Sequence, residues 1–161
     1  VAPSRGLGDV YKRQVLTQIV GEFSEKAEAN QLEMVVECPQ PPVEIYVDGR
    51  HLWRIIDNLM GNICKYAQPG TRVYITLEKF HGMVIMTFRN ISKDRLKMTS
   101  EELFGRFVRG DSSRNTEGHG LGLSIAKSLT ELMHGNLAVQ MDGDLFKVIL
   151  SFEEYQEDKK Q

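Results

Sequence analysis

Apolar side chains in the first third of the chain recur at two different spacings, and each spacing predicts one type of element. From Val15 to Asn30 they return every three or four residues, as on one face of an amphipathic helix. Two short strands are expected next, at Leu32–Glu37 and Val43–Val47, on either side of a proline-rich break. This part of the chain is therefore expected to form one helix followed by two strands.

A second amphipathic helix is expected to begin after Asp48, because the Asp48 carboxylate can accept a backbone N–H of the first helical turn. Pro69 and Gly70 are expected to end this helix. Its apolar residues predict the face that packs on the core: Leu52, Trp53, Ile55, Ile56, Leu59, Met60 and Ile63.

The middle of the chain predicts a hairpin followed by an irregular segment. Strands are expected at Arg72–Phe80 and Met83–Arg89, and the His-Gly pair between them suits a tight turn. The stretch from Asn90 to Glu117 is polar and irregular, with a short helical piece around Ser100–Phe107.

The last third begins with a glycine-rich segment, Gly118–Gly122, which is expected to lead into a helix from about Leu123 to Met133. Gly135 is expected to close that helix in the left-handed conformation that glycine adopts easily. Strands at Asn136–Met141 and Leu145–Phe152 are expected to form a final hairpin.

Helices and antiparallel hairpins that segregate in this way predict an α/β two-layer sandwich, with a mixed, mostly antiparallel sheet packed on helices. We assign Val15–Phe152 to this domain and Glu153–Gln161 to a charged C-terminal tail. Val1–Gln14 shows neither helical nor strand periodicity, and its SRGLGDVYKRQ stretch is similar to a translated sequencing-adaptor tail. We interpret Val1–Gln14 as a non-native segment, with a native linker as the alternative.

Composition narrows the class of protein. The chain has 161 residues, of which 41% are hydrophobic and 26% charged, as in a globular domain with a single core. The formal net charge is -2 and no basic run is present, which argues against a nucleic-acid partner. No apolar stretch approaches the roughly 20 residues that span a bilayer, so no membrane contact is expected of this part. Cys38 and Cys64 lack metal-ligand spacing and fit a reduced, cytoplasmic setting.

The sequence NLMGNICKYA places two asparagines inside the helix after Asp48. Asn58 and Asn62 are four residues apart and Lys65 follows three residues later, so all three share one face. Asparagine is a poor helix former, but its carboxamide oxygen is a suitable ligand for Mg²⁺, and a lysine can contact phosphate. The alternative is a solvated polar face on which the asparagines are incidental.

The glycine-rich segment before the last helix can approach an anion closely, because glycine lacks a side chain and a helix N-terminus presents unpaired N–H groups. It does not follow a strand, so it fails the test for a dinucleotide-binding fingerprint, and it lacks the Lys-Ser/Thr ending of a P-loop. The alternative is a flexible loop with a glycine cap.

Between these two motifs lies the sequence LFGRFVRGDSSR. Arginine side chains match the geometry of phosphate groups, and Arg109 and Arg114 are candidates for such a contact. Phe104 and Phe107 are three residues apart and could anchor one end of a mobile loop. The alternative is a surface loop with scattered charge.

The order of the three motifs resembles the histidine-kinase branch of the GHKL ATP-binding fold. NLMGNICKYA looks like the N box of that family, LFGRFVRGD like its F box, and GHGLGLSIAKSL like its G2 box. The resemblance extends from Val15 to about Phe152. It implies an ATP-binding catalytic domain of a two-component sensor histidine kinase, a transferase with ATP and Mg²⁺ as cofactors.

Carried over to this sequence, the resemblance implies that Asn62, with Asn58 beside it, holds Mg²⁺ on the triphosphate. It implies that Arg109 and Arg114 are catalytic and reach the terminal phosphate. The implied ATP-binding residues are Asn58, Asn62, Lys65, Tyr66, Asn90, Phe107, Arg109, Gly118, His119, Gly120, Leu121, Gly122 and Leu123.

Asn90 stands at the place of the family's Asp-x-Gly-x-Gly box, which this chain lacks. In the family the aspartate accepts a hydrogen bond from the exocyclic amine of adenine. The carboxamide oxygen of Asn90 can accept the same bond, but without the negative charge the bond is expected to be weaker. His119 also departs from the family pattern, since a smaller residue is more usual at its position.

The resemblance also bears on the reaction. Hydrolysing ATPases of this fold carry a glutamate one turn before the metal-binding asparagine, where this chain has Asn58. An amide cannot accept a proton at neutral pH, which favours phosphoryl transfer over rapid hydrolysis. The implied partners are the dimerisation and histidine-phosphotransfer domain of the same kinase and a response regulator. Only His51 precedes the N box, so this chain is expected to lack the acceptor histidine.

Two other functions are compatible with the motifs: a non-catalytic nucleotide-binding interaction module, and a serine kinase of the anti-sigma-factor type. We expect the chain to be cytoplasmic and monomeric, and its parent protein to be anchored in a membrane.

Overall fold

The structure is a computed structural model that describes residues 10–38, 44–96, 104 and 117–155, with the backbone alone for 10–16, 44 and 117–121. Five strands form one sheet in the order β2-β4-β5-β7-β6. They are β2 (Glu33–Glu37), β4 (Arg72–Phe80), β5 (Met83–Ile91), β6 (Asn136–Asp142) and β7 (Leu145–Glu153). The β2–β4 pair is parallel and the other three pairs are antiparallel. The predicted mixed, mostly antiparallel sheet is confirmed.

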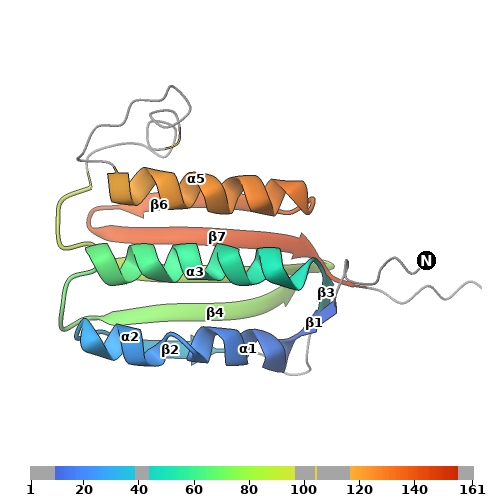
Figure 1. The fold of residues 1–161 in the computed structure, drawn as a ribbon, viewed down its shortest axis with the longest axis horizontal. Helices are drawn as coiled ribbons and strands as arrows, with labels where there is room; N and C mark the ends of the chain where they lie inside the picture. The colour runs from blue at the N-terminus through green and yellow to red at the C-terminus, as the bar shows by residue number, and fades with distance from the viewer. Residues whose placement is uncertain (1–9, 39–43, 97–103, 105–116, 156–161) are drawn as a thin grey trace, which may run out of the picture.

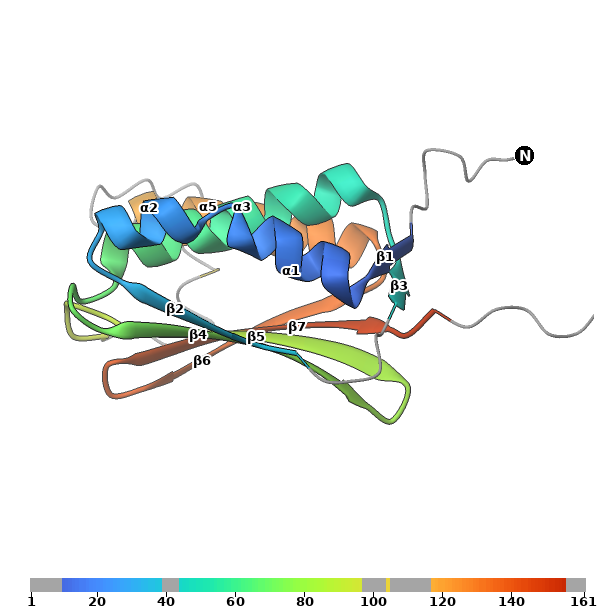
Figure 2. The same cartoon turned by 90° about the horizontal axis from the view of Figure 1, so that it is seen from below.

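The helices lie together on one face of this sheet, as Figure 2 shows, so the predicted two-layer sandwich is also confirmed. They are α1 (Arg13–Gly21), α2 (Ser24–Ala29), α3 (Gly49–Tyr66) and α5 (Glu117–Leu132). In Figure 1, α3 runs along the middle of the sheet between α5 and the α1–α2 pair. Two further strands, β1 (Val10–Lys12) and β3 (Glu44–Tyr46), pair antiparallel at one end of the domain.

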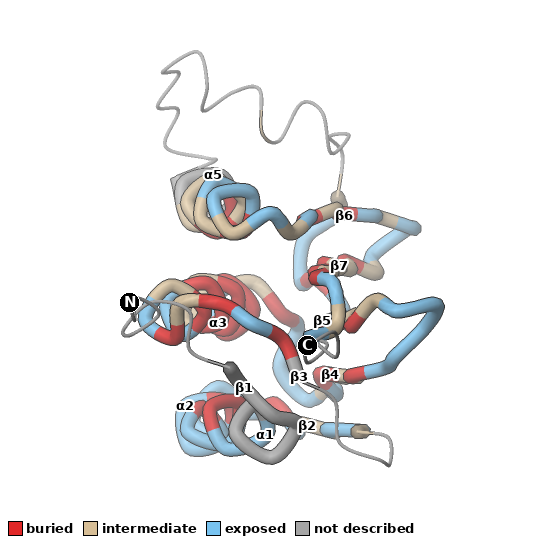
Figure 3. The backbone as a smooth tube through the Cα atoms, turned by 90° about the vertical axis from the view of Figure 1, so that its right-hand side faces the viewer, coloured by how far each residue is buried: buried red, intermediate tan, exposed pale blue. Residues whose placement is uncertain are grey.

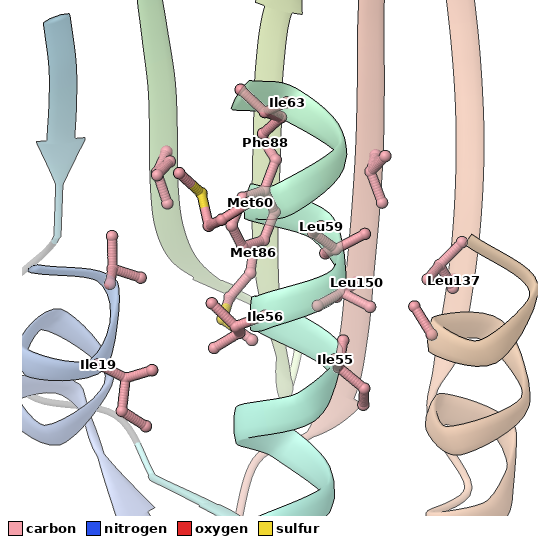
Figure 4. Packing of buried hydrophobic residues seen from close by; sticks show 14 of the residues in the cluster. Ile19, Ile55, Ile56, Leu59, Met60, Ile63, Met86, Phe88, Leu137 and Leu150 are labelled. Atoms are coloured by element: carbon pink, nitrogen blue, oxygen red, sulfur yellow. The ribbon is translucent and has the colours of Figure 1, made fainter. Parts of the chain in front are cut away.

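The core lies between the two layers. Alternate residues of β5 and β7 are buried, because successive strand side chains point to opposite faces and the helices cover one face only. Figure 3 shows the buried side of α3 turned toward the sheet. Figure 4 shows side chains of this core from both layers: Ile55, Ile56, Leu59, Met60 and Ile63 from α3, with Met86, Phe88, Leu137 and Leu150 from the sheet.

Local chemistry places the start of α3 where the sequence predicts it. The Asp48 carboxylate accepts a hydrogen bond from the backbone N–H of Arg50 at 2.9 Å. Burial alone would raise the pKa of Asp48, but this hydrogen bond and the charge of His51 outweigh burial and lower the pKa below its ordinary 3.8.

Replacing Asp48 with alanine is expected to lower the free energy of unfolding by about 1 kcal/mol at pH 7. A carboxyl with a lowered pKa stabilises the folded state above its unfolded pKa and loses that effect as pH falls. The difference between wild type and Asp48→Ala should therefore shrink below about pH 4. Urea unfolding from pH 3 to pH 7 measures this, with Asp48→Asn as the control that keeps the cap but not the charge. A difference that stays constant with pH would contradict the role of the carboxylate.

Four details differ from the sequence prediction. The predicted single helix at Val15–Asn30 is wrong, because the chain bends between α1 and α2. At the bend Phe23 is buried, at 6% exposed, with its ring centroid 6.1 Å from that of Trp53. Burial of this ring at the bend outweighs the uniform helical periodicity.

Trp53 is the second difference, since the helical pattern assigned it to the core. Its side chain is 41% exposed, and its indole N–H donates to a carboxylate oxygen of Glu22 at 3.3 Å. An indole has both an apolar ring and a polar N–H, so it is well suited to the rim of the core.

The third difference concerns Val1–Gln14, whose sequence shows no strand or helical periodicity. Val10–Lys12 nevertheless pairs with β3, and α1 begins at Arg13. The interpretation of Val1–Gln14 as non-native stays a prediction. The fourth is the end of the last helix, where His134, not Gly135, has the left-handed conformation, with φ of 65°. Gly135 is required for a different reason, which is close approach to β7.

Candidate functional site

The helices α3 and α5 bring two of the predicted motifs together. They run side by side across the sheet, and the C-terminal end of α3 lies beside the N-terminal end of α5 (Figure 1). A Cβ placed on Gly122 would lie 3.9 Å from the backbone oxygen of Asn58. The glycine-rich motif therefore contacts the asparagine helix directly.

Asn62 is buried in α3, with 7% of its surface exposed. Its carboxamide oxygen is buried and accepts no hydrogen bond within the described part of the chain. A buried polar atom without a partner costs about 1–3 kcal/mol, so a group supplied from outside would restore the lost interaction. A neutral oxygen in this state is suited to a cation or to a hydrogen-bond donor.

Asn58, one turn earlier, is half-buried, and its unpartnered buried atom is the amide nitrogen. A nitrogen that carries two hydrogens donates hydrogen bonds and does not bind a metal ion. In this orientation Asn58 offers a donor for a phosphate or hydroxyl oxygen. A metal contact would have to come from its oxygen.

Lys65 and Tyr66 follow at the end of α3. The Lys65 side chain is exposed, and its Nζ lies 5.7 Å from the centroid of the half-buried Tyr66 ring. The backbone oxygen of Tyr66 accepts a hydrogen bond from the N–H of Lys93 at 2.9 Å. This bond fastens the end of α3 to the segment after β5, so both can serve one site.

Asn90 lies on β5, on the strand face that the helices cover, and is 3% exposed. Its carboxamide oxygen is buried and has no hydrogen-bond partner among the residues that the structure describes. Two residues later, the Ser92 hydroxyl bonds both the backbone oxygen and the backbone N–H of Asp94, at 2.8 and 3.2 Å. This turn occupies the place at which the GHKL resemblance predicts glycines.

Ser124 is a candidate that sequence reasoning missed. It lies in α5, and its hydroxyl oxygen is buried without a hydrogen-bond partner in the described chain. Its neighbours Leu123 and Ala126 are fully buried, at 0% exposed, so this turn of α5 packs tightly. A serine inside an apolar helical pattern gives no signal in the sequence, because the signal is its missing partner.

The start of α5 corrects a further prediction. The segment Gly118–Gly122 is not a loop before the helix, since its backbone is helical from Glu117. Glycine destabilises a helix interior by about 1 kcal/mol but does not forbid it. Packing of Leu123 and Ala126 fixes the next turn, and the helix extends back from that turn. The free N–H groups of the first turn therefore belong to residues before Leu123.

Several predicted site residues cannot be placed. Phe107, Arg109 and Arg114 lie outside the described residues, and of Gly118, His119, Gly120 and Leu121 the backbone alone is described. Phe104 is half-buried, and the Nζ of Lys127 lies 5.3 Å from its ring centroid. The F-box motif thus contacts α5 through Phe104.

The buried unpartnered atoms of Asn58, Asn62, Asn90 and Ser124 come from three elements, α3, β5 and α5. Across the described residues, no three His, Cys, Asp or Glu side chains form a group that could hold a metal ion. A metal ion bound here would therefore be held by neutral side-chain oxygens, together with the charged groups of a ligand bound beside it.

The described residues contain no helix long and apolar enough to cross a membrane.

Two hollows lie elsewhere on the molecule. One, of about 640 Å³, is lined by residues that include Gln31, Arg72 and Tyr74. The other, of about 420 Å³, is lined by residues that include Tyr46 and Phe152. Neither is lined by Asn58, Asn62, Asn90 or Ser124, so neither hollow is a better candidate for the site.

Comparison with known proteins identifies the family of this chain. The sequence pattern of the family described as histidine kinase-, DNA gyrase B- and HSP90-like ATPase matches residues 47–156. The chain belongs to this family. The match includes α3, β5 and α5, the three elements that carry the unpartnered atoms.

Its relatives are sensor kinases. The sensor histidine kinase RppB of Synechocystis is 32% identical over 141 residues, which cover 84% of this chain and 31% of RppB. The probable sensor protein PcoS of Escherichia coli is 39% identical over 107 residues, covering 64% of this chain and 23% of PcoS. The chain thus spans less than a third of the length of these curated relatives. Its sequence is that of a histidine-kinase ATP-binding catalytic domain.

Solved structures show the same fold. The mycobacterial sensor histidine kinase MprB superimposes with a TM-score of 0.72 at 20% identity, covering 92% of this chain and 98% of that structure. The catalytic domain of the histidine kinase ThkA superimposes with a TM-score of 0.74 at 18% identity, covering 91% and 96%. The agreement over nearly the full length of both confirms the GHKL-type fold.

Proposed function

We propose that this ATP-binding domain transfers the γ-phosphate of ATP to a histidine on a dimerisation domain outside this chain. From there the phosphate would pass to an aspartate of a response regulator. The observation that carries the proposal is the pair of buried, unpartnered carboxamide oxygens of Asn62 and Asn90, on two elements that are fastened together. A cytoplasmic location, and a membrane anchor elsewhere in the parent protein, are part of this proposal.

The residues at the end of α3 suit the phosphate side of the nucleotide. The neutral oxygen of Asn62 fits Mg²⁺, which takes its remaining ligands from phosphate and water. When bound, Mg²⁺ would neutralise charge on the phosphates. Asn58 would donate to a phosphate oxygen, and Lys65 would add a positive charge at the open side.

The remaining predicted residues complete the proposed site. Arg109 and Arg114 would contact the terminal phosphate, where charge develops during transfer. The first turn of α5, with Gly118 and Gly120, would bring backbone N–H groups to the phosphates, and Gly122 would keep the approach to α3 close. Tyr66 would pack beside the nucleoside. Transfer to a protein is favoured over hydrolysis, because Asn58 stands where a general base would be needed and an amide cannot accept a proton.

A labelling experiment tests the transfer. The chain with [γ-³²P]ATP and Mg²⁺ is expected to bind nucleotide without labelling itself. Added to a parent kinase that carries Asn62→Ala, it should label that protein on histidine, giving an acid-labile and base-stable product. Stable label on the isolated chain would contradict the expected absence of an acceptor. Label on serine of the partner would support an anti-sigma-type kinase, and binding without any transfer would support an interaction module.

A further inference from the structure

Asn90 differs from the other unpartnered side chains in its surroundings. It is the most buried of the polar residues on the sheet, at 3% exposed, and its register partner on β7 is the buried Phe146. On its own strand the preceding residue of the same face is Phe88, at 1% exposed. A carboxamide in such apolar surroundings suits a flat heteroaromatic ring with a hydrogen-bonding edge. It does not suit a charged phosphate, which would lose its hydration there.

The carboxamide can present its two polar atoms in either order. Its oxygen accepts no hydrogen bond from the described residues, so no donor among them fixes which way the amide faces. The group carries an acceptor oxygen and a donor NH₂, and a half-turn about its last bond exchanges their positions. A carboxylate at the same place would present acceptors only.

The two kinds of purine differ at the edge that such a group would contact. A 6-aminopurine has a donor amine at position 6 and an acceptor nitrogen at position 1. A 6-oxopurine has an acceptor oxygen at position 6 and a donor N–H at position 1. One orientation of the Asn90 amide matches the first pattern, and the half-turned orientation matches the second. A carboxylate matches only the amine and repels the oxygen.

We propose that Asn90 sets the base selectivity of this site and allows it to take 6-oxopurine nucleotides as well as adenine nucleotides. The proposal rests on the proposed function, since it requires the base of the bound nucleotide to lie against Asn90. An acidic residue at this position would accept the amine of an adenine nucleotide but repel the oxygen of a 6-oxopurine.

The test compares ADP with inosine diphosphate, which carries the 6-oxo edge and no amino group at position 2. Calorimetric titrations with Mg²⁺ on the whole chain should give dissociation constants for the two within about tenfold of each other. In Asn90→Asp the affinity for inosine diphosphate should fall by about 100-fold relative to that for ADP. Asn90→Leu, which has similar volume and no polar edge, should weaken both nucleotides to the same extent.

If the buried carboxylate prevents Asn90→Asp from folding, circular dichroism will show it. The ratio of the wild-type dissociation constants for ADP and inosine diphosphate then decides the inference alone. Wild-type discrimination against inosine diphosphate by about 100-fold or more would overturn it. If wild type binds the two nucleotides equally and Asn90→Asp also binds them equally, the inference is overturned as well, because Asn90 then does not set the selectivity. If wild type binds neither nucleotide, the proposed function fails and the inference with it. Binding of ADP alone would leave the proposed function standing and reject the inference.

Discussion

Replacement of Asn62 with alanine is expected to lower the affinity of the chain for Mg²⁺-ATP by at least about 100-fold. The Asn62 oxygen is the buried acceptor on α3 that has no partner in the described structure, and it lies in the helix turn between Asn58 and Lys65. Loss of a direct metal contact removes the link between protein and phosphates, and the described residues contain no group of three His, Cys, Asp or Glu side chains that could hold the ion instead.

Calorimetry with a non-hydrolysable ATP analogue, with and without Mg²⁺, measures this effect. In wild type, Mg²⁺ should strengthen binding, and in Asn62→Ala the metal should make little difference. Asn136→Ala is the matched control, because Asn136 is an exposed asparagine on β6, in the outermost strand of the sheet away from β5. Affinity that still depends on Mg²⁺ in Asn62→Ala would show that the metal is held elsewhere. Thermal unfolding of both variants separates loss of binding from loss of fold.

Elements determined by local chemistry could be predicted from the sequence. The Asp48 carboxylate caps α3 as predicted, since a cap needs only a side chain and the backbone N–H groups that follow it. The hairpin between β4 and β5 turns at His81 and Gly82, which both have positive φ. In both places the determining atoms lie within a few residues of each other.

Elements determined by distant contacts were predicted less well. The break between α1 and α2 depends on burial of Phe23 beside Trp53, thirty residues further along the chain. The start of α5 depends on Leu123 and Ala126, whose burial against the rest of the domain extends the helix back into the glycines. Helical periodicity records which residues share a face, but not where the chain bends to fit the sheet.

In the candidate site, too, features set by local sequence could be predicted and features set by distant contacts could not. The types and spacing of Asn58, Asn62 and Lys65 predicted an oxygen-rich face, and the structure adds which atoms are buried without partners. Ser124 was missed and the orientation of Asn58 was not foreseen, because an unsatisfied atom depends on all its neighbours in space. Arg109 and Arg114 stay predictions, since they lie outside the described residues.

Replacement of Gly135 with alanine is expected to lower the free energy of unfolding by about 3 kcal/mol, the upper part of the range for overpacking a core. A Cβ on Gly135 would lie 2.5 and 2.6 Å from two ring carbons of Phe152 and 2.8 Å from the backbone oxygen of Ser151. The Phe152 ring is buried, at 2% exposed, and the backbone oxygen belongs to a strand paired on both sides. Neither group can move without disturbing β7.

Gly61→Ala is the control that separates close approach from the general effect of a methyl group. Gly61 lies inside α3, and a Cβ there would meet no atom within 4 Å. Because glycine costs about 0.5–1 kcal/mol in a helix interior, this change should raise the free energy of unfolding by that amount. Thermal unfolding should therefore show the two alanine variants shifted in opposite directions, with Gly135→Ala lower by about 6–12 °C. A Gly135→Ala melting temperature equal to wild type would mean that Gly135 lies further from β7 than the structure shows.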